Sequence, residues 1–197
     1  MTMLFFVRHG AHALQGEVLA GRTDVALSPA GVEQARWLGE RLAREQVSVL
    51  HTSPQQRTRE TATVIAHRIG RAAEMIPALD EVNVGDWTGS PLQALDRDPR
   101  WQQWNATRSM ARPPNGESML EVQMRVIAHI ERVRAGHPEE QVVLVTHADV
   151  VRAALVYYLG LDIDSFWRLE VSPGSLTALL TGQWGAKLLS LNEVMAA

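Results

Sequence analysis

The 197-residue chain has no cysteine, and this absence excludes several kinds of protein at once. Disulfide-stabilised scaffolds, thiolate zinc sites and cysteine nucleophiles all require a thiol group. Any reactive site in this chain must therefore be built from other side chains.

The chain also lacks an excess of one charge and a long apolar run. Lys+Arg 19 against Asp+Glu 22 gives a net charge of −3, with no run of like charges. We therefore expect no general electrostatic grip on nucleic acid or an acidic membrane. The apolar stretch Met3 to Val7 is too short for a signal-peptide core or a membrane span, so a cytoplasmic protein is expected.

Apolar runs of strand length alternate with longer segments of helical period. This alternation predicts an α/β fold with a largely parallel sheet. The predicted strands are 3–7, 47–50, 74–77 and 141–146, and the predicted helices are 30–44, 54–69, 119–135 and 150–159. Two more strand-like runs, 176–181 and 187–192, predict a hairpin and hence an antiparallel strand at one edge. Because no repeat or linker divides the sequence, we expect a single domain over residues 1–197.

Four serines mark predicted helix starts. Ser28, Ser53 and Ser90 each precede a proline, which is favoured at the first helical position, and Ser118 precedes Glu121 at capping-box spacing. We therefore expect the Ser53 side chain to cap the helix that follows it. Asp149 is expected to be either a helix N-cap or a substrate contact.

Three polar clusters come directly after predicted strands. They are Arg8-His9-Gly10, residues 53–57 with Arg57, and Thr146-His147. Ligands bind at the carboxyl edge of open α/β sheets, because strand-end loops and helix N-termini converge there. A domain of this length has a radius of gyration of roughly 16 Å, so His9 and His147 can meet. Two histidines with two arginines would form a basic pocket, and forked guanidinium donors suit phosphate oxygens.

A phosphoryl group in such a pocket needs a nucleophile and an acid. Either histidine can attack phosphorus through a neutral ring nitrogen, and nearby arginines disfavour the imidazolium form. The leaving alkoxide needs a proton, so a carboxyl group must stand close by. The candidates in loops near this edge are Asp80, Glu81, Asp86, Glu117 and Asp149.

An ordered set of motifs gives the chain a family resemblance. The set contains Val7-Arg8-His9-Gly10, Gly21, Asp24, Leu27-Ser28-Pro29-Ala30-Gly31, Gln34-Ala35, Thr52-Ser53-Pro54, Arg57, Glu60-Thr61-Ala62, Leu79, Glu81, Gly85, Trp87, Gly89, Pro114-Asn115-Gly116-Glu117-Ser118 and Val145-Thr146-His147. In this order the motifs resemble the histidine phosphatase superfamily. The resemblance implies a phosphoglycerate mutase-like fold, a three-layer α/β/α sandwich, and it spans most of the chain to about Val151.

The resemblance also assigns roles to the predicted pocket. It implies that His9 is the phosphorylated nucleophile and that Glu81 donates the proton to the leaving group. The residues that it implies for holding the phosphoryl oxygens are Arg8, Arg57 and His147. It further implies secondary substrate contacts at Gln15 and at the backbone N–H of Gly21, in a site that uses no metal and no cofactor.

Departures from the family pattern concern specificity. Ala11 replaces the acidic or amide residue that commonly follows Arg-His-Gly, and Asp149 stands where many members have a small residue. The segment 92–114 lacks the long basic insertion of the glycolytic mutases. This absence favours hydrolysis over mutase-type phosphoryl transfer. His12 lies in the loop over residues 8–27, which we call the site loop, and has no motif role. A zinc site from His9 and His12 lacks a third ligand nearby.

The sequence therefore predicts a metal-independent phosphomonoesterase acting on a small phosphorylated metabolite. Phosphoglycerate mutase-type transfer and a non-catalytic regulatory or binding module of the same fold remain as alternatives. The expected partner is a small-molecule phosphate ester, with no nucleic acid and no membrane, and the hairpin edge could pair in a homodimer. Trp101 and Trp104 are expected to pack one helix face against the core or, alternatively, to form a lid over the pocket. The remaining residues considered are expected to be structural or at the surface: His51, His67, His129, His137 and Trp87.

Overall fold

The computed structural model describes residues 1–196, and its centre is a six-stranded sheet with the order β3-β2-β4-β1-β5-β6. The strands are β1 (Thr2–Arg8), β2 (Val47–Thr52), β3 (Ala73–Met75), β4 (Gln141–Thr146), β5 (Leu176–Gly182) and β6 (Gly185–Glu193). Strands β3, β2, β4 and β1 pair in parallel, whereas β5 runs antiparallel to both β1 and β6. The predicted mostly parallel sheet with an antiparallel edge is confirmed.

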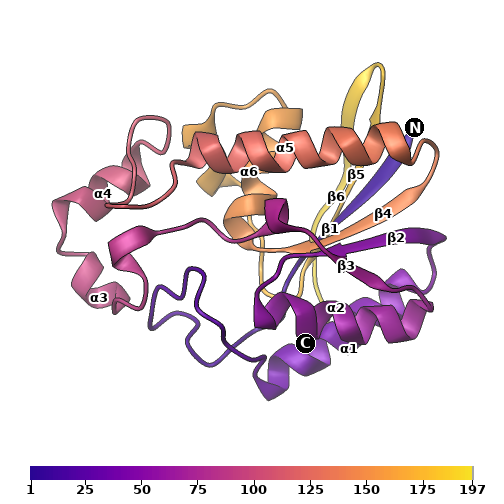
Figure 1. Ribbon diagram of the computed structural model, residues 1–197, viewed down its shortest axis with the longest axis horizontal. Helices are drawn as coiled ribbons and strands as arrows, with labels where there is room; N and C mark the ends of the chain where they lie inside the picture. Colours follow the sequence, from indigo (N-terminus) through magenta and orange to yellow (C-terminus); the bar gives the residue numbers. More distant parts are fainter. Residues whose placement is uncertain (197) are drawn as a thin grey trace.

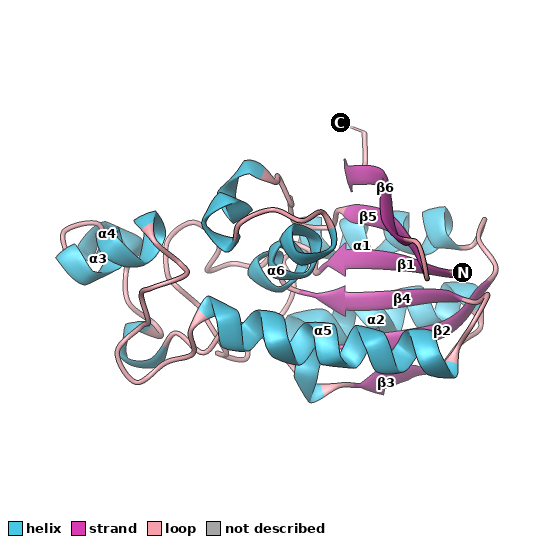
Figure 2. Cartoon of the chain, turned by 90° about the horizontal axis from the view of Figure 1, so that it is seen from above, coloured by secondary structure: helices cyan, strands magenta, loops and turns pink. Residues whose placement is uncertain are grey.

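Helices cover both faces of the sheet, with α1 and α2 on one side and α5 and α6 on the other (Figures 1 and 2). They are α1 (Pro29–Leu42), α2 (Gln56–Ile69), α5 (Met119–Gly136) and α6 (Ala148–Tyr158). Side chains of β1 alternate between two apolar clusters, because successive residues of a strand point to opposite faces. Leu4 and Phe6 pack with α5 and α6, and Phe5 and Val7 pack with α1 and α2. This is the expected three-layer sandwich.

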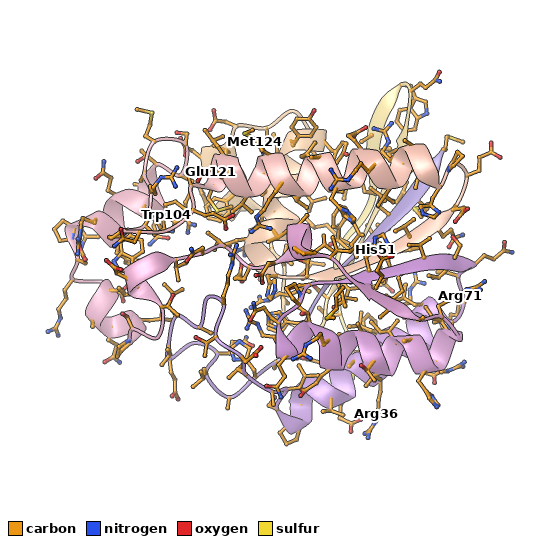
Figure 3. All side chains as sticks on the ribbon, in the orientation of Figure 1. Arg36, His51, Arg71, Trp104, Glu121 and Met124 are labelled. Atoms are coloured by element: carbon orange, nitrogen blue, oxygen red, sulfur yellow. The ribbon has the colours of Figure 1, made fainter. Side chains whose placement is uncertain are left out.

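Residues 85–116 form a segment that we call the cap, and it lies beyond the ends to which β1 and β4 point (Figure 2). The cap contains η2 (Gly85–Trp87), α3 (Leu92–Leu95) and α4 (Pro99–Ala106). Sequence reasoning missed α4 because residues 101–114 have no clean helical period; Asp98 caps this helix by accepting from Arg100 N–H. Trp104 of α4 is 1% exposed, so it is a core residue (Figure 3).

Two of the four predicted serine caps are present. Ser28 accepts a hydrogen bond from Gly31 N–H at the start of α1, and Ser118 forms a full capping box with Glu121 at the start of α5. The predictions for Ser53 and Ser90 are wrong. Helix α3 begins at Leu92, with Pro91 as its N-cap residue and no side-chain cap. Helix α2 begins only at Gln56, without a side-chain cap, because the Ser53 hydroxyl forms a hydrogen bond with Nε2 of His147.

The prediction of Asp149 as a helix N-cap is also wrong. Helix α6 begins at Ala148, so His147 is the N-cap residue and Asp149 lies in the first turn.

Two short 3₁₀ helices complete the fold, η1 (Pro77–Leu79) and η3 (Ile163–Arg168). Within residues 1–196, none of the helices is both long and apolar enough to traverse a bilayer.

Candidate active site

The carboxyl ends of β1 and β4 lie side by side, and each continues into a residue of the predicted pocket. Arg8 is in register with Thr146, and His9 N–H donates to the carbonyl oxygen of Thr146 at 3.0 Å. This pairing brings the rings of His9 and His147 to 5.2 Å between centroids. The two histidines therefore meet as expected, although they come from opposite ends of the chain.

His9 is buried, and its two ring nitrogens have different surroundings. Nδ1 lies 2.7 Å from the carbonyl oxygen of Gly10, which can only accept a hydrogen bond, so Nδ1 carries the proton. Nε2 accepts a hydrogen bond from Nε of Arg57 at 3.2 Å. Burial lowers the pKa of His9 well below its ordinary value, and the charges of Arg57 and Arg8 lower it further. The ring is therefore neutral, with the Nε2 lone pair directed at the guanidinium.

Arg57, in the first turn of α2, is fixed on all sides although it is almost completely buried. Its Nη2 donates to the carbonyl oxygen of Gly21 at 2.7 Å, and its Nη1 donates to that of Thr23 at 3.0 Å. Nη2 also lies 3.2 Å from Nδ1 of His147. Burial lowers the pKa of Arg57, yet a guanidinium remains charged at any physiological pH. The side chain is thus a preorganised cation between the two histidines.

His147 is connected to a chain of polar groups behind the site. A guanidinium only donates, so Nδ1 accepts from Arg57 and Nε2 carries the ring proton. Nε2 then donates to the Ser53 hydroxyl at 2.8 Å, and that hydroxyl donates to Oδ1 of Asp80 at 3.4 Å. Burial lowers the pKa of His147, followed by the charge of Arg57. Sequence reasoning assigned Ser53 to a helix cap, although its place directly after a strand end was a signal for this role.

Arg8 supplies a second guanidinium at the same edge. Its Nη1 donates to the carbonyl oxygen of Val171 at 2.7 Å, which anchors the side chain. Its buried Nε has no hydrogen-bond partner among residues 1–196. Burial lowers the pKa of Arg8, whereas the nearby carboxyl of Glu81 raises it. Arg8 therefore retains one hydrogen-bond donor that no group of the described residues satisfies.

Glu81 places a carboxyl group beside His147. Its Oε2 lies 3.6 Å from Nδ1 of His147, and its Oε1 accepts from Val82 N–H at 2.9 Å. Burial raises the pKa of Glu81 to about 7, and the charge of Asp149 adds to the rise. Near neutral pH this carboxyl group can both give and accept a proton, as a general acid and base must.

The other carboxyl candidates are committed elsewhere. Asp80 pairs with Gln55 Nε2 and Arg22 Nε, and Glu117 pairs with Arg125 and Arg22. Asp86 accepts from the side chain of Asn115. Arg22 and Arg125 also donate to the backbone carbonyl of Glu81, at 2.8 and 3.2 Å, so these arginines hold the backbone of Glu81 in place.

The secondary candidates have different environments. Gly21 adopts φ of +50°, and a Cβ atom there would lie 2.8 Å from Val84 Cγ2; its carbonyl serves Arg57. Gln15 is exposed in a turn that starts at His12. The His12 ring lies 5.5 Å from that of His9, and burial lowers its pKa to about 4, followed by Arg57. Its buried Nδ1 has no partner among residues 1–196, so His12 joins the site.

Two histidines expected to be structural form a separate pair. His51 and His129 are buried, with Nδ1 of His51 at 3.2 Å from Nε2 of His129, so they satisfy one another. Across the described residues 1–196, the structure contains no group of three or more His, Cys, Asp or Glu side chains arranged to hold a metal ion.

The fold and the cluster of site residues together define an α/β protein with a basic, histidine-containing site at the carboxyl edge of its sheet. A family model described as histidine phosphatase superfamily (branch 1) matches residues 4–194. The chain belongs to this superfamily.

Individual relatives differ in the activity that their names give. The chain is 30% identical over 196 residues to phosphoserine phosphatase 1 of Hydrogenobacter thermophilus, covering 98% of this chain and 92% of the relative. It is 29% identical over 183 residues to a protein of Yersinia pestis provisionally named phosphoglycerate mutase GpmB, covering 90% and 84%. A mycobacterial glucosyl-3-phosphoglycerate phosphatase structure superposes with a TM-score of 0.89 at 25% identity, covering 97% and 98%.

Proposed function

We propose that this protein is a metal-independent phosphomonoesterase that hydrolyses a small phosphorylated metabolite through a phosphohistidine on His9. Arg8, Arg57 and His147 hold the phosphoryl oxygens, and Glu81 is the general acid and base. The observation that carries the proposal is the buried, unprotonated Nε2 of His9, 3.2 Å from Nε of Arg57. A nucleophile beside a fixed cation suits attack on an anionic phosphoryl group, since the cation offsets charge repulsion.

In the first step, Nε2 of His9 attacks phosphorus in line with the leaving oxygen. The N–P bond forms as the P–O bond breaks, and Glu81 transfers its proton to the departing oxygen. The products are a free alcohol, phosphohistidine and the Glu81 carboxylate. The ring gains positive charge, which the hydrogen bond from its Nδ1–H to the carbonyl oxygen of Gly10 stabilises.

In the second step, water attacks the phosphohistidine. The Glu81 carboxylate takes a proton from this water as the new O–P bond forms, and the N–P electron pair returns to Nε2 of His9. Phosphate leaves, and both residues are restored to their starting forms. A carboxyl group with a pKa of about 7 suits both steps, because each protonation state is populated near neutrality.

The substrate is proposed to be a small phosphate monoester whose leaving group lies between the site loop and the cap. Gln15 and the N–H of Gly21 are proposed secondary contacts at this opening. The relatives' names support the phosphate ester class, since they give phosphoserine and glucosyl-3-phosphoglycerate as substrates. The whole chain, residues 1–197, is proposed to act as one domain. A homodimer and a cytoplasmic location remain predictions.

A mutase activity is the second candidate, favoured by the relative named as a phosphoglycerate mutase. Both activities share the first step and differ in what accepts the phosphoryl group from His9. Hydrolysis gives inorganic phosphate, whereas a mutase returns the group to another hydroxyl of a phosphoglycerate. Product analysis with a phosphoglycerate therefore separates them.

The proposal is tested by phosphate release from a panel of small phosphomonoesters in the presence of EDTA. We expect release from at least one ester, and loss of at least about 10³-fold in His9→Ala. His67→Ala, an exposed histidine on α2, is the matched control and should retain wild-type turnover. Equal activity in His9→Ala, or dependence of turnover on a divalent metal, would overturn the proposal.

A further inference from the structure

Asp80 comes directly before Glu81 in the chain, and its carboxylate contacts several segments of the protein. Its Oδ1 accepts from the backbone N–H of Glu81 at 2.8 Å, from Nε2 of Gln55 at 2.8 Å and from the Ser53 hydroxyl at 3.4 Å. Its Oδ2 lies 3.2 Å from Nε of Arg22, and the Asp80 side chain is only 13% exposed. Neither the proton transfers nor the phosphate contacts of the proposed mechanism use this carboxylate.

The backbone of Glu81 is held on both sides of its Cα atom. Asp80 accepts from its N–H, and Nε of Arg22, which also contacts Asp80, donates to its carbonyl oxygen at 2.8 Å. The side chain has less support. Its Oε1 accepts from Val82 N–H, whereas its Oε2 lies 3.6 Å from Nδ1 of His147, which is too long for a hydrogen bond. The place of the Glu81 carboxyl group therefore depends on the backbone that Asp80 fixes.

The same carboxylate reaches the residues proposed to hold phosphate. Nε2 of His147 donates to the Ser53 hydroxyl at 2.8 Å, and that hydroxyl donates to Asp80. Asp80 thereby turns a lone pair of the hydroxyl toward His147. Gln55 is buried at the N-cap position of α2, so its bond to Asp80 connects the carboxylate to the helix whose first turn contains Arg57. One side chain thus connects the acid with the phosphate-holding side of the site.

We propose that Asp80 is a positioning residue that holds the acid Glu81 at a fixed distance from His147, and so determines how well the site protonates an alkoxide leaving group. This inference rests on the proposed function of Glu81. Formation of the N–P bond and cleavage of the P–O bond place negative charge on the departing oxygen. An alkoxide needs the Glu81 proton at that moment, whereas an aryl oxide of low basicity leaves without it. A displacement of about 1 Å costs up to about 10²-fold, so a displaced acid slows alkyl esters more than aryl esters.

The test compares Asp80→Ala with wild type on an alkyl phosphate and on p-nitrophenyl phosphate. In the variant, kcat/KM for the aryl ester should fall by about tenfold, because the Ser53 hydroxyl loses its orientation toward His147. The alkyl ester should lose about a further tenfold, since it also needs the proton of Glu81. This further loss should fall on kcat and not on KM, because the proton moves only in the transition state. An unchanged ratio of alkyl to aryl turnover would overturn the inference.

Two variants separate positioning from a general loss of structure. Asp80→Asn should bring the alkyl-to-aryl ratio back to within about threefold of wild type, because its amide oxygen can replace Oδ1, which faces three donors. Ser53→Ala removes only the connection to His147, so it should slow both esters equally. A ratio that falls as far in either variant as in Asp80→Ala would contradict the inference.

Asp98→Ala is the matched control for the loss of a partly buried aspartate. Asp98 also accepts from a backbone N–H and pairs with a guanidinium, both of Arg100, but it lies at the start of α4 in the cap. This variant should lower the free energy of unfolding without changing the ratio of the two esters. A fall in the ratio equal to that in Asp80→Ala would show that the ratio reports stability and would overturn the inference.

A second substitution serves if Asp80→Ala does not fold. Gln55→Met removes one of the three donors to Oδ1 and keeps the volume of a buried side chain. The alkyl-to-aryl ratio should then fall by about threefold, in the same direction as in Asp80→Ala. An unchanged ratio in a folded Gln55→Met protein would overturn the inference.

Crystal structures of wild type and Asp80→Ala separate the inference from the proposed function, because they need no turnover. In the variant we expect the Glu81 carboxyl group to move away from Nδ1 of His147, from the 3.6 Å seen here. A carboxyl group that stays at that distance would overturn the inference even if the enzyme hydrolyses phosphate esters. Movement of the carboxyl group in a protein without phosphatase activity would overturn the proposed function alone.

Discussion

The Nε atom of Arg57 donates to Nε2 of His9 at 3.2 Å, and the same guanidinium reaches Nδ1 of His147. One side chain of α2 thus joins the residues that follow β1 and β4. Because its other donors are fixed by backbone carbonyl oxygens, the guanidinium does not need to reorganise when an anion binds. After burial, the charge of Arg57 is the largest cause that lowers the pKa of both histidines.

Arg57→Lys should lower kcat/KM by about 10² to 10³, because an ammonium group cannot keep four directed contacts at once. The change also leaves the carbonyl oxygens of Gly21 and Thr23 without their donors, so the free energy of unfolding should fall by about 2 kcal/mol. Steady-state kinetics and urea unfolding measure the two effects. Arg59→Lys, at an exposed position of the same helix, is the control; comparable losses in both variants would contradict the assignment.

Ser53→Ala should reduce kcat/KM by about tenfold, since His147 loses the acceptor that fixes the proton on Nε2. The alternative tautomer would place a proton on Nδ1, toward Arg57. The matched control is Ser48→Ala, because Ser48 is a β2 serine whose hydroxyl donates to the carbonyl oxygen of Gln141 at the far end of the strand. Kinetics that are the same in both variants would argue against a role for Ser53 in orienting His147.

The pH dependence of alkyl phosphate hydrolysis should report Glu81. Its pKa is raised to about 7, and the protonated form is the active acid, so kcat/KM should fall above about pH 7. His9 must be neutral, and its pKa is lowered, so the acidic limb should lie well below pH 6.5. Glu81→Gln should be about 10² to 10⁴ slower and lack the high-pH limb. A limb that persists in Glu81→Gln would assign the acid to another residue.

Stability should decrease as the pH falls from about 6.5 to about 4. His9, His12 and His147 have pKa values lowered by burial, so the unfolded chain binds more protons in this window and acid favours unfolding. Glu81 acts in the opposite sense, because its raised pKa contributes stability below about pH 4.5 that is lost as the pH rises through about 7.

The histidines outnumber the single carboxyl group, so the net effect of acid is destabilising. The loss between pH 7 and pH 5 should be on the order of 2 kcal/mol. Urea unfolding at the two pH values, with the same ionic strength, measures it directly. A transition midpoint that is equal or higher at pH 5 would contradict the buried, neutral state of these rings.

The sequence was sufficient for the parts of the fold that depend on local pattern. The alternation of strands and helices predicted the sheet, and Ser28 and Ser118 began their helices as expected. The strand-end positions of His9 and His147 predicted their meeting, since parallel strands end at a common edge.

Features that depend on tertiary contacts could not be predicted in this way. Ser53 has the local sequence of a helix cap, but the nearby Nε2 of His147 takes its hydroxyl. Asp149 has a residue type that is common at helix N-caps, yet its carboxylate pairs with Arg108 from residues 85–116. The helix α4 gives no clear period because Trp104 is the one side chain of α4 that is fully buried.

The measurement that tests the account most directly is trapping of the covalent intermediate. The enzyme is mixed rapidly with a phosphate ester that it hydrolyses, and the reaction is quenched in alkali. Peptide mass spectrometry should then locate an acid-labile phosphoryl group on Nε2 of His9. The trapped fraction should rise in a variant that slows the water attack, such as Glu81→Gln assayed with an aryl phosphate. A phosphoryl group on any other residue, or turnover with no covalent intermediate, would contradict the account.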